Sequence, residues 1–176
     1  MKINPMLLKD GYKVGHIFQY EKGTQYVYSN FTPRKFRTST PGVIFFGLQY
    51  FVMEYLWDQF NTLFFQQDKD TVVGEYRDVI TSYLGPISVE HIANLHNLGY
   101  LPIKIKALPE GTLSPENVPL LTIQNTHPDF FWVTNMLETL MSCELWKLTT
   151  SATSAFNFRL NFEQYARETG AARDFI

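Results

Sequence analysis

A run rich in apolar side chains between residues 129 and 146 limits the folds open to this chain more than any other feature. The run follows Asn125-Thr126-His127-Pro128-Asp129, in which Pro128 suits the first turn of a helix and Asp129 favours its positive end. It predicts a helix with apolar residues nearly all round: Phe130, Phe131, Trp132, Val133, Met136, Leu137, Leu140 and Met141. A helix without a polar face is buried on all sides, so the rest of the chain is expected to surround it.

Further helices are predicted on both sides of this segment. An amphipathic helix begins at Gly47 and places one apolar face at three- and four-residue steps, made of Leu48, Phe51, Val52, Tyr55, Leu56, Phe60 and Leu63. A second helix covers about 69–84 and stops before Gly85-Pro86, and a third ends near Gly99. Small polar residues at 149–154 lead into a last helix, about 152–168, ended by Gly170.

Alternation of side-chain character predicts the strands. Residues 24–31 place Tyr26, Tyr28 and Asn30 on one face and Val27, Ser29 and Phe31 on the other. Residues 103–107 alternate in the same way, and a turn at 109–111 leads to a second strand at 120–124, which favours antiparallel pairing. A short buried strand is expected at 43–46, and a helical turn within 3–20. The pattern indicates an α+β fold with mixed helices and mainly antiparallel strands.

Composition narrows the class of protein. The 176 residues are enough for one domain but not comfortably for two, so 1–176 is expected to be a single α/β domain. A net charge of −2 argues against nucleic-acid binding or adhesion to an acidic membrane. No apolar run reaches the roughly 18 residues of a membrane span. Cys143 is the single cysteine, so no internal disulfide can form, and a cytoplasmic location is expected.

Generic catalytic motifs are absent from the sequence, and the four histidines are scattered. His91 and His96 are five residues apart, which is off the spacing that lets two histidines of one helix bind a metal. Cys143 lies within the apolar helix, which favours an inert buried thiol. Glu138 lies in the same helix and should find a partner such as an Arg, a Lys or backbone N–H groups. A structural role is the preferred interpretation of Glu138.

A polar cluster near the amino terminus carries a more specific signal. Asp10-Gly11-Tyr12-Lys13-Val14-Gly15-His16, with Gln19-Tyr20 after it, resembles the "D-x-Y-K-V-x-H…Q-Y" segment of nicotinamide phosphoribosyltransferases. Further matches follow in order along nearly the whole chain: Val27 to Phe31, Arg34, Phe46 to Tyr50, Leu101 to Gly111, Asn125 to Pro128, Trp132, Thr134-Asn135, Glu138-Thr139 and Thr149 to Ser154. Departures are modest, namely the glycines at 11 and 15 and a shorter stretch between Arg34 and Phe45.

The resemblance implies a fold and a reaction. It implies the amino-terminal domain of a type II phosphoribosyltransferase without its α/β barrel, with the helices near 149–168 leading toward that barrel. The family's enzyme is a homodimer with its active sites at the subunit interface. It makes nicotinamide mononucleotide and pyrophosphate from nicotinamide and phosphoribosyl pyrophosphate, usually with Mg²⁺, in NAD salvage.

The resemblance also implies roles for three residues. Tyr12 is implied to reach into the partner subunit's pocket and stack on nicotinamide, with Asp10 beside it, which suits a planar, electron-poor ring. Arg34 is implied to hold phosphate or pyrophosphate, whose oxygens match the guanidinium fork. The alternatives are an interface-packing Tyr12, a helix-capping Asp10 and a solvated Arg34. No residue of the chain is expected to be a metal ligand or to act as a catalytic group.

The family's second stacking aromatic, its amide-selecting aspartate and its main phosphate-binding residues match no position of this sequence. The chain is therefore expected to be inactive alone and to need a chain that carries the barrel. Two other interpretations stay open: a non-catalytic binding or regulatory module that pairs with a phosphoribosyltransferase, and a degenerate remnant.

Overall fold

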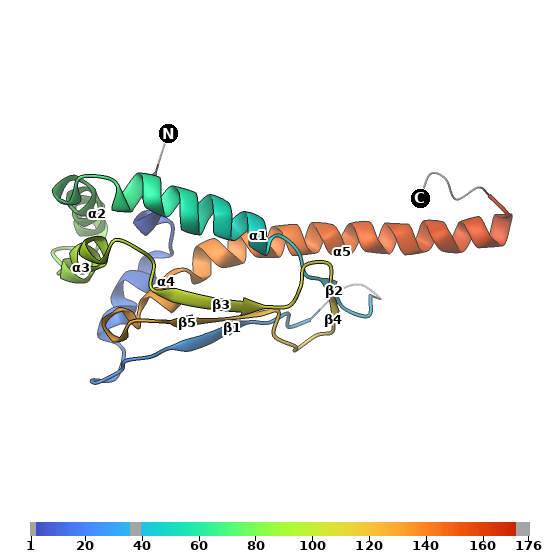
Figure 1. The fold of residues 1–176 in the computed structure, drawn as a ribbon, viewed down its shortest axis with the longest axis horizontal. Helices are drawn as coiled ribbons and strands as arrows, with labels where there is room; N and C mark the ends of the chain where they lie inside the picture. The colour runs from blue at the N-terminus through green and yellow to red at the C-terminus, as the bar shows by residue number, and fades with distance from the viewer. Residues whose placement is uncertain (1–2, 36–39, 172–176) are drawn as a thin grey trace.

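Three antiparallel strands form the main sheet in the computed structural model, which describes residues 3–35 and 40–171. The strand order is β1 (Tyr28–Phe31), β5 (Leu121–Asn125), β3 (Ile103–Ala107), with β5 in the centre (Figure 1). Ser29 of β1 and Ile105 of β3 both lie opposite Ile123 of β5. The predicted antiparallel pairing and the mixed α+β class are confirmed.

A second, two-stranded sheet pairs β2 (Val43–Ile44) with β4 (Leu113–Ser114), and the sequence did not predict β4. Gly42 allows this pairing, because a Cβ atom at position 42 would lie 2.2 Å from the carbonyl oxygen of Ser114. The chain stays paired beyond the strands: Phe45 N–H donates to the carbonyl of Thr112, at 3.0 Å.

The amphipathic helix after Gly47 changes its winding along its length. It begins as α1 (Leu48–Phe51) and continues with the wider turns of a π-type helix over η3 (Val52–Gln59) and η4 (Asn61–Phe65). The N–H of Gln66 donates to the carbonyl of Asn61, five residues back, at 2.9 Å. The wider turn places Phe64 in the core, whereas the three- and four-residue steps of an α-helix predicted Leu63.

The two helices that follow are the ones predicted, and they form one end of the molecule (Figure 1). α2 (Lys69–Leu84) begins at Asp68, whose carboxylate accepts a hydrogen bond from the N–H of Thr71 at 2.9 Å. α3 (Glu90–Leu98) ends at Gly99, where φ is +80°. Two 3₁₀ helices near the amino terminus, η1 (Pro5–Leu7) and η2 (Gly11–Phe18), give the helical turn expected there.

The carboxyl-terminal helices differ from the prediction in their boundaries. A 3₁₀ turn, η5 (Pro128–Phe130), and a short α4 (Val133–Met136) precede one continuous helix, α5 (Glu138–Thr169), which Gly170 ends. The predicted interruption at 149–154 is absent, because Thr149 and Thr153 continue the helix and place their hydroxyls against the strand segment 44–46.

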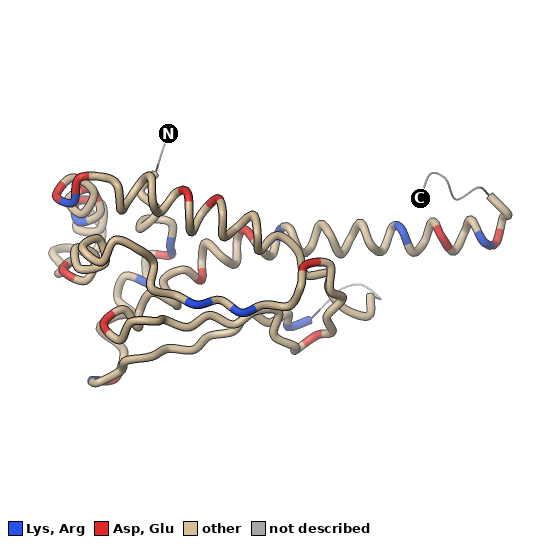
Figure 2. The backbone as a smooth tube through the Cα atoms, in the orientation of Figure 1, with Lys and Arg blue, Asp and Glu red and all other residues tan. Residues whose placement is uncertain are grey.

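α5 leaves the body of the molecule, and its carboxyl-terminal half extends alone (Figure 1). Charged residues of both signs are spaced along this free half (Figure 2). The expectation of a helix buried on all sides was therefore wrong beyond its first turns: Leu140, Met141 and Leu145 are buried, but Cys143 is exposed and Trp146 is 37% exposed. α5 packs on β2, α1 and α4.

Candidate functional site

The polar segment 10–16 is held by the first turn of α5. The backbone N–H of Asp10 donates to Thr139 Oγ1 at 3.2 Å, and that hydroxyl donates to the Asp10 carboxylate at 2.8 Å. The ammonium of Lys13 forms an ion pair with Glu138, the neighbour of Thr139. Two consecutive residues of α5 thus bind two positions of the segment, which fixes its orientation.

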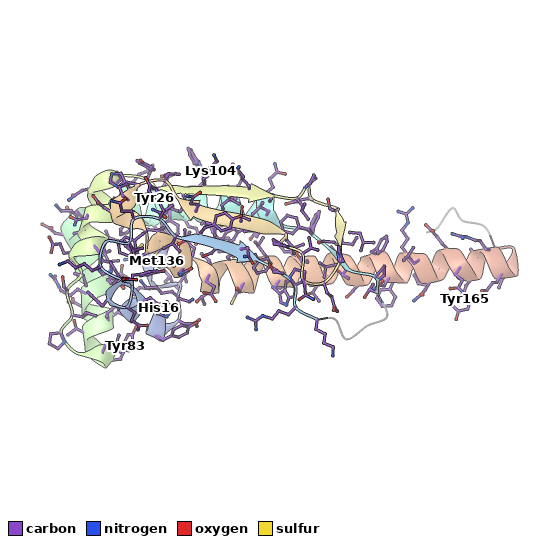
Figure 3. All side chains as sticks on the ribbon, turned by 90° about the horizontal axis from the view of Figure 1, so that it is seen from below. His16, Tyr26, Tyr83, Lys104, Met136 and Tyr165 are labelled. Carbon is purple, nitrogen blue, oxygen red and sulfur yellow. The ribbon has the colours of Figure 1, made fainter. Side chains whose placement is uncertain are left out.

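Tyr12 lies between these two attachment points and projects into solvent. Its side chain is 61% exposed, with the His16 ring edge-on at 5.2 Å and the Lys13 ammonium 5.1 Å from its ring centroid. Figure 3 shows His16, Met136 and Tyr83 at the end of the molecule opposite Tyr165. An exposed ring on a fixed backbone is free to stack on a flat ligand or to pack against another chain.

Asn135 connects Tyr20, which follows η2, to Ser29 of β1. Its amide nitrogen donates to the Tyr20 hydroxyl at 2.5 Å, and its amide oxygen accepts from Ser29 Oγ at 2.9 Å. Burial raises the pKa of the Tyr20 hydroxyl above its ordinary value. A pocket of about 260 Å³ opens beside this chain of hydrogen bonds, between β1 and the start of α5, and Glu138 is among the residues that line it.

Arg34 lies in an adjoining pocket of about 440 Å³ on the same side of α5. Lys35 lines this pocket too, together with Trp146 and, again, Glu138. Trp146 is held edge-on by the Phe31 ring at 5.5 Å. Both Arg34 and Lys35 are exposed, and among residues 3–35 and 40–171 no acidic side chain forms an ion pair with either. The pocket thus combines two cations with an aromatic wall, a combination that suits a phosphate-bearing ligand.

The residue just before the segment, Lys9, enters a weakly polar environment. Burial lowers the pKa of Lys9 to about 7, and its ammonium lies 4.8 Å from the Tyr76 ring centroid. Burial, and then the charge of Lys9, lowers the pKa of His91 to about 4. The His91 ring packs edge-on against Trp132 at 4.9 Å. A neutral His91 is therefore part of the packing near pH 7, and no ligand role is assigned to it.

The three residues implied by the resemblance are each linked to the start of α5 in a different way. Asp10 is bonded to Thr139, Tyr12 lies beside Lys13, the partner of Glu138, and Arg34 lines a pocket that Glu138 also lines. Asp10 is the residue before η2, but its carboxylate does not cap that helix. It accepts from Thr139 instead, so a helix-capping role does not account for Asp10. Arg34 is exposed and lines a pocket, a placement compatible with either interpretation of this residue.

Sequence reasoning assigned no role to Lys13, Thr139 or Asn135. One signal pointed to Lys13: Glu138 was expected to find a cationic or N–H partner, and that prediction is confirmed. Lys13 is the buried member of the pair, with a side chain 2% exposed against 59% for Glu138. The interpretation of Cys143 as a buried thiol was wrong, because it lies on the open side of α5.

The described residues show neither a metal-ion site nor a membrane span. Within 3–35 and 40–171, no group of three or more His, Cys, Asp or Glu side chains could hold a metal ion. None of the helices described is long and apolar enough to cross a membrane.

The fold defines the class of protein. The crystal structure of human nicotinic acid phosphoribosyltransferase matches this chain with a TM-score of 0.66 at 24% sequence identity, over 88% of this chain and 28% of that one. The fold of this chain is thus similar to about a quarter of that phosphoribosyltransferase structure.

The sequence then defines the family. The family model for the nicotinamide phosphoribosyltransferase N-terminal domain matches residues 4–105, and the chain belongs to this family. The nicotinamide phosphoribosyltransferase of Acinetobacter baylyi is 49% identical over 97% of this chain and 35% of its own length. That of Xanthomonas campestris is 29% identical over 94% of this chain and 34% of its own length. The chain thus spans about a third of the length of these relatives.

Proposed function

We propose that the chain is the amino-terminal portion of a transferase that makes nicotinamide mononucleotide and pyrophosphate from nicotinamide and phosphoribosyl pyrophosphate, in NAD salvage. The observation that carries the proposal is the attachment of Asp10 and Lys13 to α5, which presents Tyr12 outward from a fixed backbone. Family membership supports it. Because relatives are about three times longer, the proposal includes a barrel supplied by a further part of the enzyme, within a homodimer or a complex in the cytoplasm.

In this proposal Tyr12 holds the nicotinamide ring in a neighbouring subunit's pocket. A ring that is 61% exposed offers a flat face to the electron-poor pyridine. Asp10 fixes the approach of the segment through Thr139. Holding the pyridine in one orientation brings its ring nitrogen toward the ribose carbon and converts a bimolecular encounter into a positioned one.

Arg34 acts on the leaving group. As the ring nitrogen bonds to the ribose carbon, the bond from that carbon to pyrophosphate breaks and negative charge collects on the departing oxygens. A guanidinium in the pocket stabilises that charge with its fork of N–H donors. The chain supplies binding and orientation, and Mg²⁺ belongs to the complete enzyme with phosphoribosyl pyrophosphate.

A chimera tests the proposal without knowledge of the missing part. This chain replaces the aligned segment of the Acinetobacter baylyi relative, to which it is 49% identical, and formation of nicotinamide mononucleotide is measured. We expect an active chimera, and Arg34→Ala should raise the KM for phosphoribosyl pyrophosphate about tenfold or more. A folded but inactive chimera would favour a non-catalytic module or a remnant.

A further inference from the structure

Glu138 has an unusual position, because it lines both pockets of the candidate site. Among the described residues that line either pocket it is the one acidic side chain, and it shares the larger pocket with Arg34 and Lys35. Its side chain is 59% exposed and belongs to the first residue of α5. A carboxylate in that place is a natural counter-ion for the two cations, and would then compete with an anionic ligand for them.

Lys13 already pairs with Glu138. The Lys13 ammonium contacts the Glu138 carboxylate, and the Lys13 side chain is 2% exposed. A buried ammonium needs a paired anion, so Glu138 is the partner that Lys13 requires. The same ammonium lies 5.1 Å from the Tyr12 ring centroid. One cation therefore neutralises the pocket's acid and contacts the exposed aromatic ring.

We propose that Lys13 is a positioning residue that keeps Glu138 from neutralising Arg34 and Lys35, so that these two cations can bind a polyphosphate anion. The inference rests on the proposed function, because it names what prepares the anion pocket of that same site. It assigns Lys13 no contact with the ligand. Its effect is electrostatic and passes through Glu138.

The inference predicts effects of opposite sign for the two members of the pair. Lys13→Met leaves Glu138 to pair with Arg34 and Lys35, and should weaken the binding of inorganic pyrophosphate about tenfold. Glu138→Gln removes the competing charge from the pocket and should tighten pyrophosphate binding several-fold. The double variant has no competing acid and should bind at least as tightly as the wild-type chain. If the pair only stabilised packing, Glu138→Gln would weaken binding too, because it leaves a buried ammonium unpaired.

The experiment is calorimetric titration of the 176-residue chain with inorganic pyrophosphate at low ionic strength, with circular dichroism to verify folding. The four samples are the wild type, both single variants and the double variant. Arg34→Ala is added as a control that removes one of the two cations of the pocket. Tighter binding by Glu138→Gln with weaker binding by Lys13→Met supports the inference. Weaker binding by Glu138→Gln overturns it. So does unchanged binding by Lys13→Met.

The reference variant separates this inference from the proposed function. If Arg34→Ala loses pyrophosphate binding while Lys13→Met does not, the role given to Lys13 is wrong and the role given to Arg34 stands. If Arg34→Ala binds as the wild type does, or the wild type binds no pyrophosphate, the anion pocket itself is wrong, and both proposals about it fall. Lys13→Met replaces a buried ammonium by an apolar side chain and leaves only an exposed carboxylate unpaired, so it is expected to fold even if Glu138→Gln, which leaves Lys13 unpaired, does not. The double variant, which removes both charges, then tests the loss of the competing acid.

Discussion

The two halves of α5 belong to one helix but have different surroundings. The first half, about 138–153, is packed against β2 and α1 and holds buried residues throughout: Leu140, Met141, Leu145, Thr149 and Thr153. The second half, about 154–169, extends from the body with Phe158, Phe162 and Tyr165 all more than half exposed. In the second half, contacts within the helix are the visible support, such as the ion pair of Arg159 with Glu163 at 2.9 Å.

The comparison shows that α5 continues as a helix where it has no site, and that the candidate site depends on where α5 packs. Where α5 continues beyond the body, ion pairs within the helix accompany it, such as Arg159 with Glu163. The candidate site forms where α5 is anchored, because there Glu138 and Thr139 meet a segment more than 120 residues earlier in the chain. Substitutions at matched residues in the two halves of α5 measure how much the packing of the first half contributes.

The largest expected difference is in the apolar contacts. Leu145→Ala removes a side chain with no exposed surface and should lower the free energy of unfolding by about 2–5 kcal/mol. Phe158→Ala removes a larger side chain that is 63% exposed, and should change stability by no more than about 0.5 kcal/mol. Urea unfolding followed by circular dichroism measures both. Equal losses would mean that the second half is packed as the first is.

Two glycines with positive φ provide the next comparison. Gly47, with φ +101°, faces α5, and a Cβ atom there would lie 2.4 Å from Leu148 Cδ1. Gly47→Ala should therefore cost about 2–4 kcal/mol, from backbone strain plus overpacking. Gly170 ends the free half with φ +69° and open space around it, so Gly170→Ala should cost about 1 kcal/mol. Thermal unfolding measures the loss of stability in each variant. A larger loss in Gly170→Ala than in Gly47→Ala would contradict the anchoring of α5 at Gly47.

A smaller effect is expected from the hydroxyl that joins α5 to β2. Thr153 Oγ1 accepts the N–H of Ile44 at 2.9 Å and donates to the carbonyl of Thr149 at 2.7 Å. Thr153→Val removes the acceptor from that N–H and should cost about 1–3 kcal/mol. Ser154→Ala is the control, because Ser154 makes the same bond within the helix but faces solvent. A cost for Ser154→Ala as large as that for Thr153→Val would show that the contact with β2 contributes little.

Much of the fold could be predicted because local patterns agree with it. The alternation in 28–31 and 103–107 matches the paired strands, and Gly99 ends its helix as expected. The incorrect predictions concern features that depend on tertiary contacts or on an unusual helix. The small polar residues at 149–154 suggested an interruption, but Thr149 and Thr153 place their hydroxyls against the strand segment 44–46 without leaving the helix. The shift from Leu63 to Phe64 requires a widened helix, for which the sequence has no simple signal.

The site was less predictable, because its members come from distant parts of the chain. The motif at 10–16 indicated Asp10 and Tyr12. The position of Glu138 in an apolar run indicated that its carboxylate needs a partner. Nothing local indicated that this partner is Lys13, which lies 125 residues away, or that Thr139 holds Asp10. Those pairings follow from how α5 meets the amino-terminal segment.

The most direct test of the central claim, that the anchored segment presents Tyr12 to nicotinamide, is the KM for nicotinamide in the chimera with the Acinetobacter baylyi relative. Tyr12→Ala should raise this KM about tenfold, because the stacking face is lost, and Tyr12→Phe should keep it near the wild-type value. Tyr28→Ala, at an equally exposed tyrosine on β1, should change nothing. An unchanged KM in Tyr12→Ala, with the chimera active, would contradict the account.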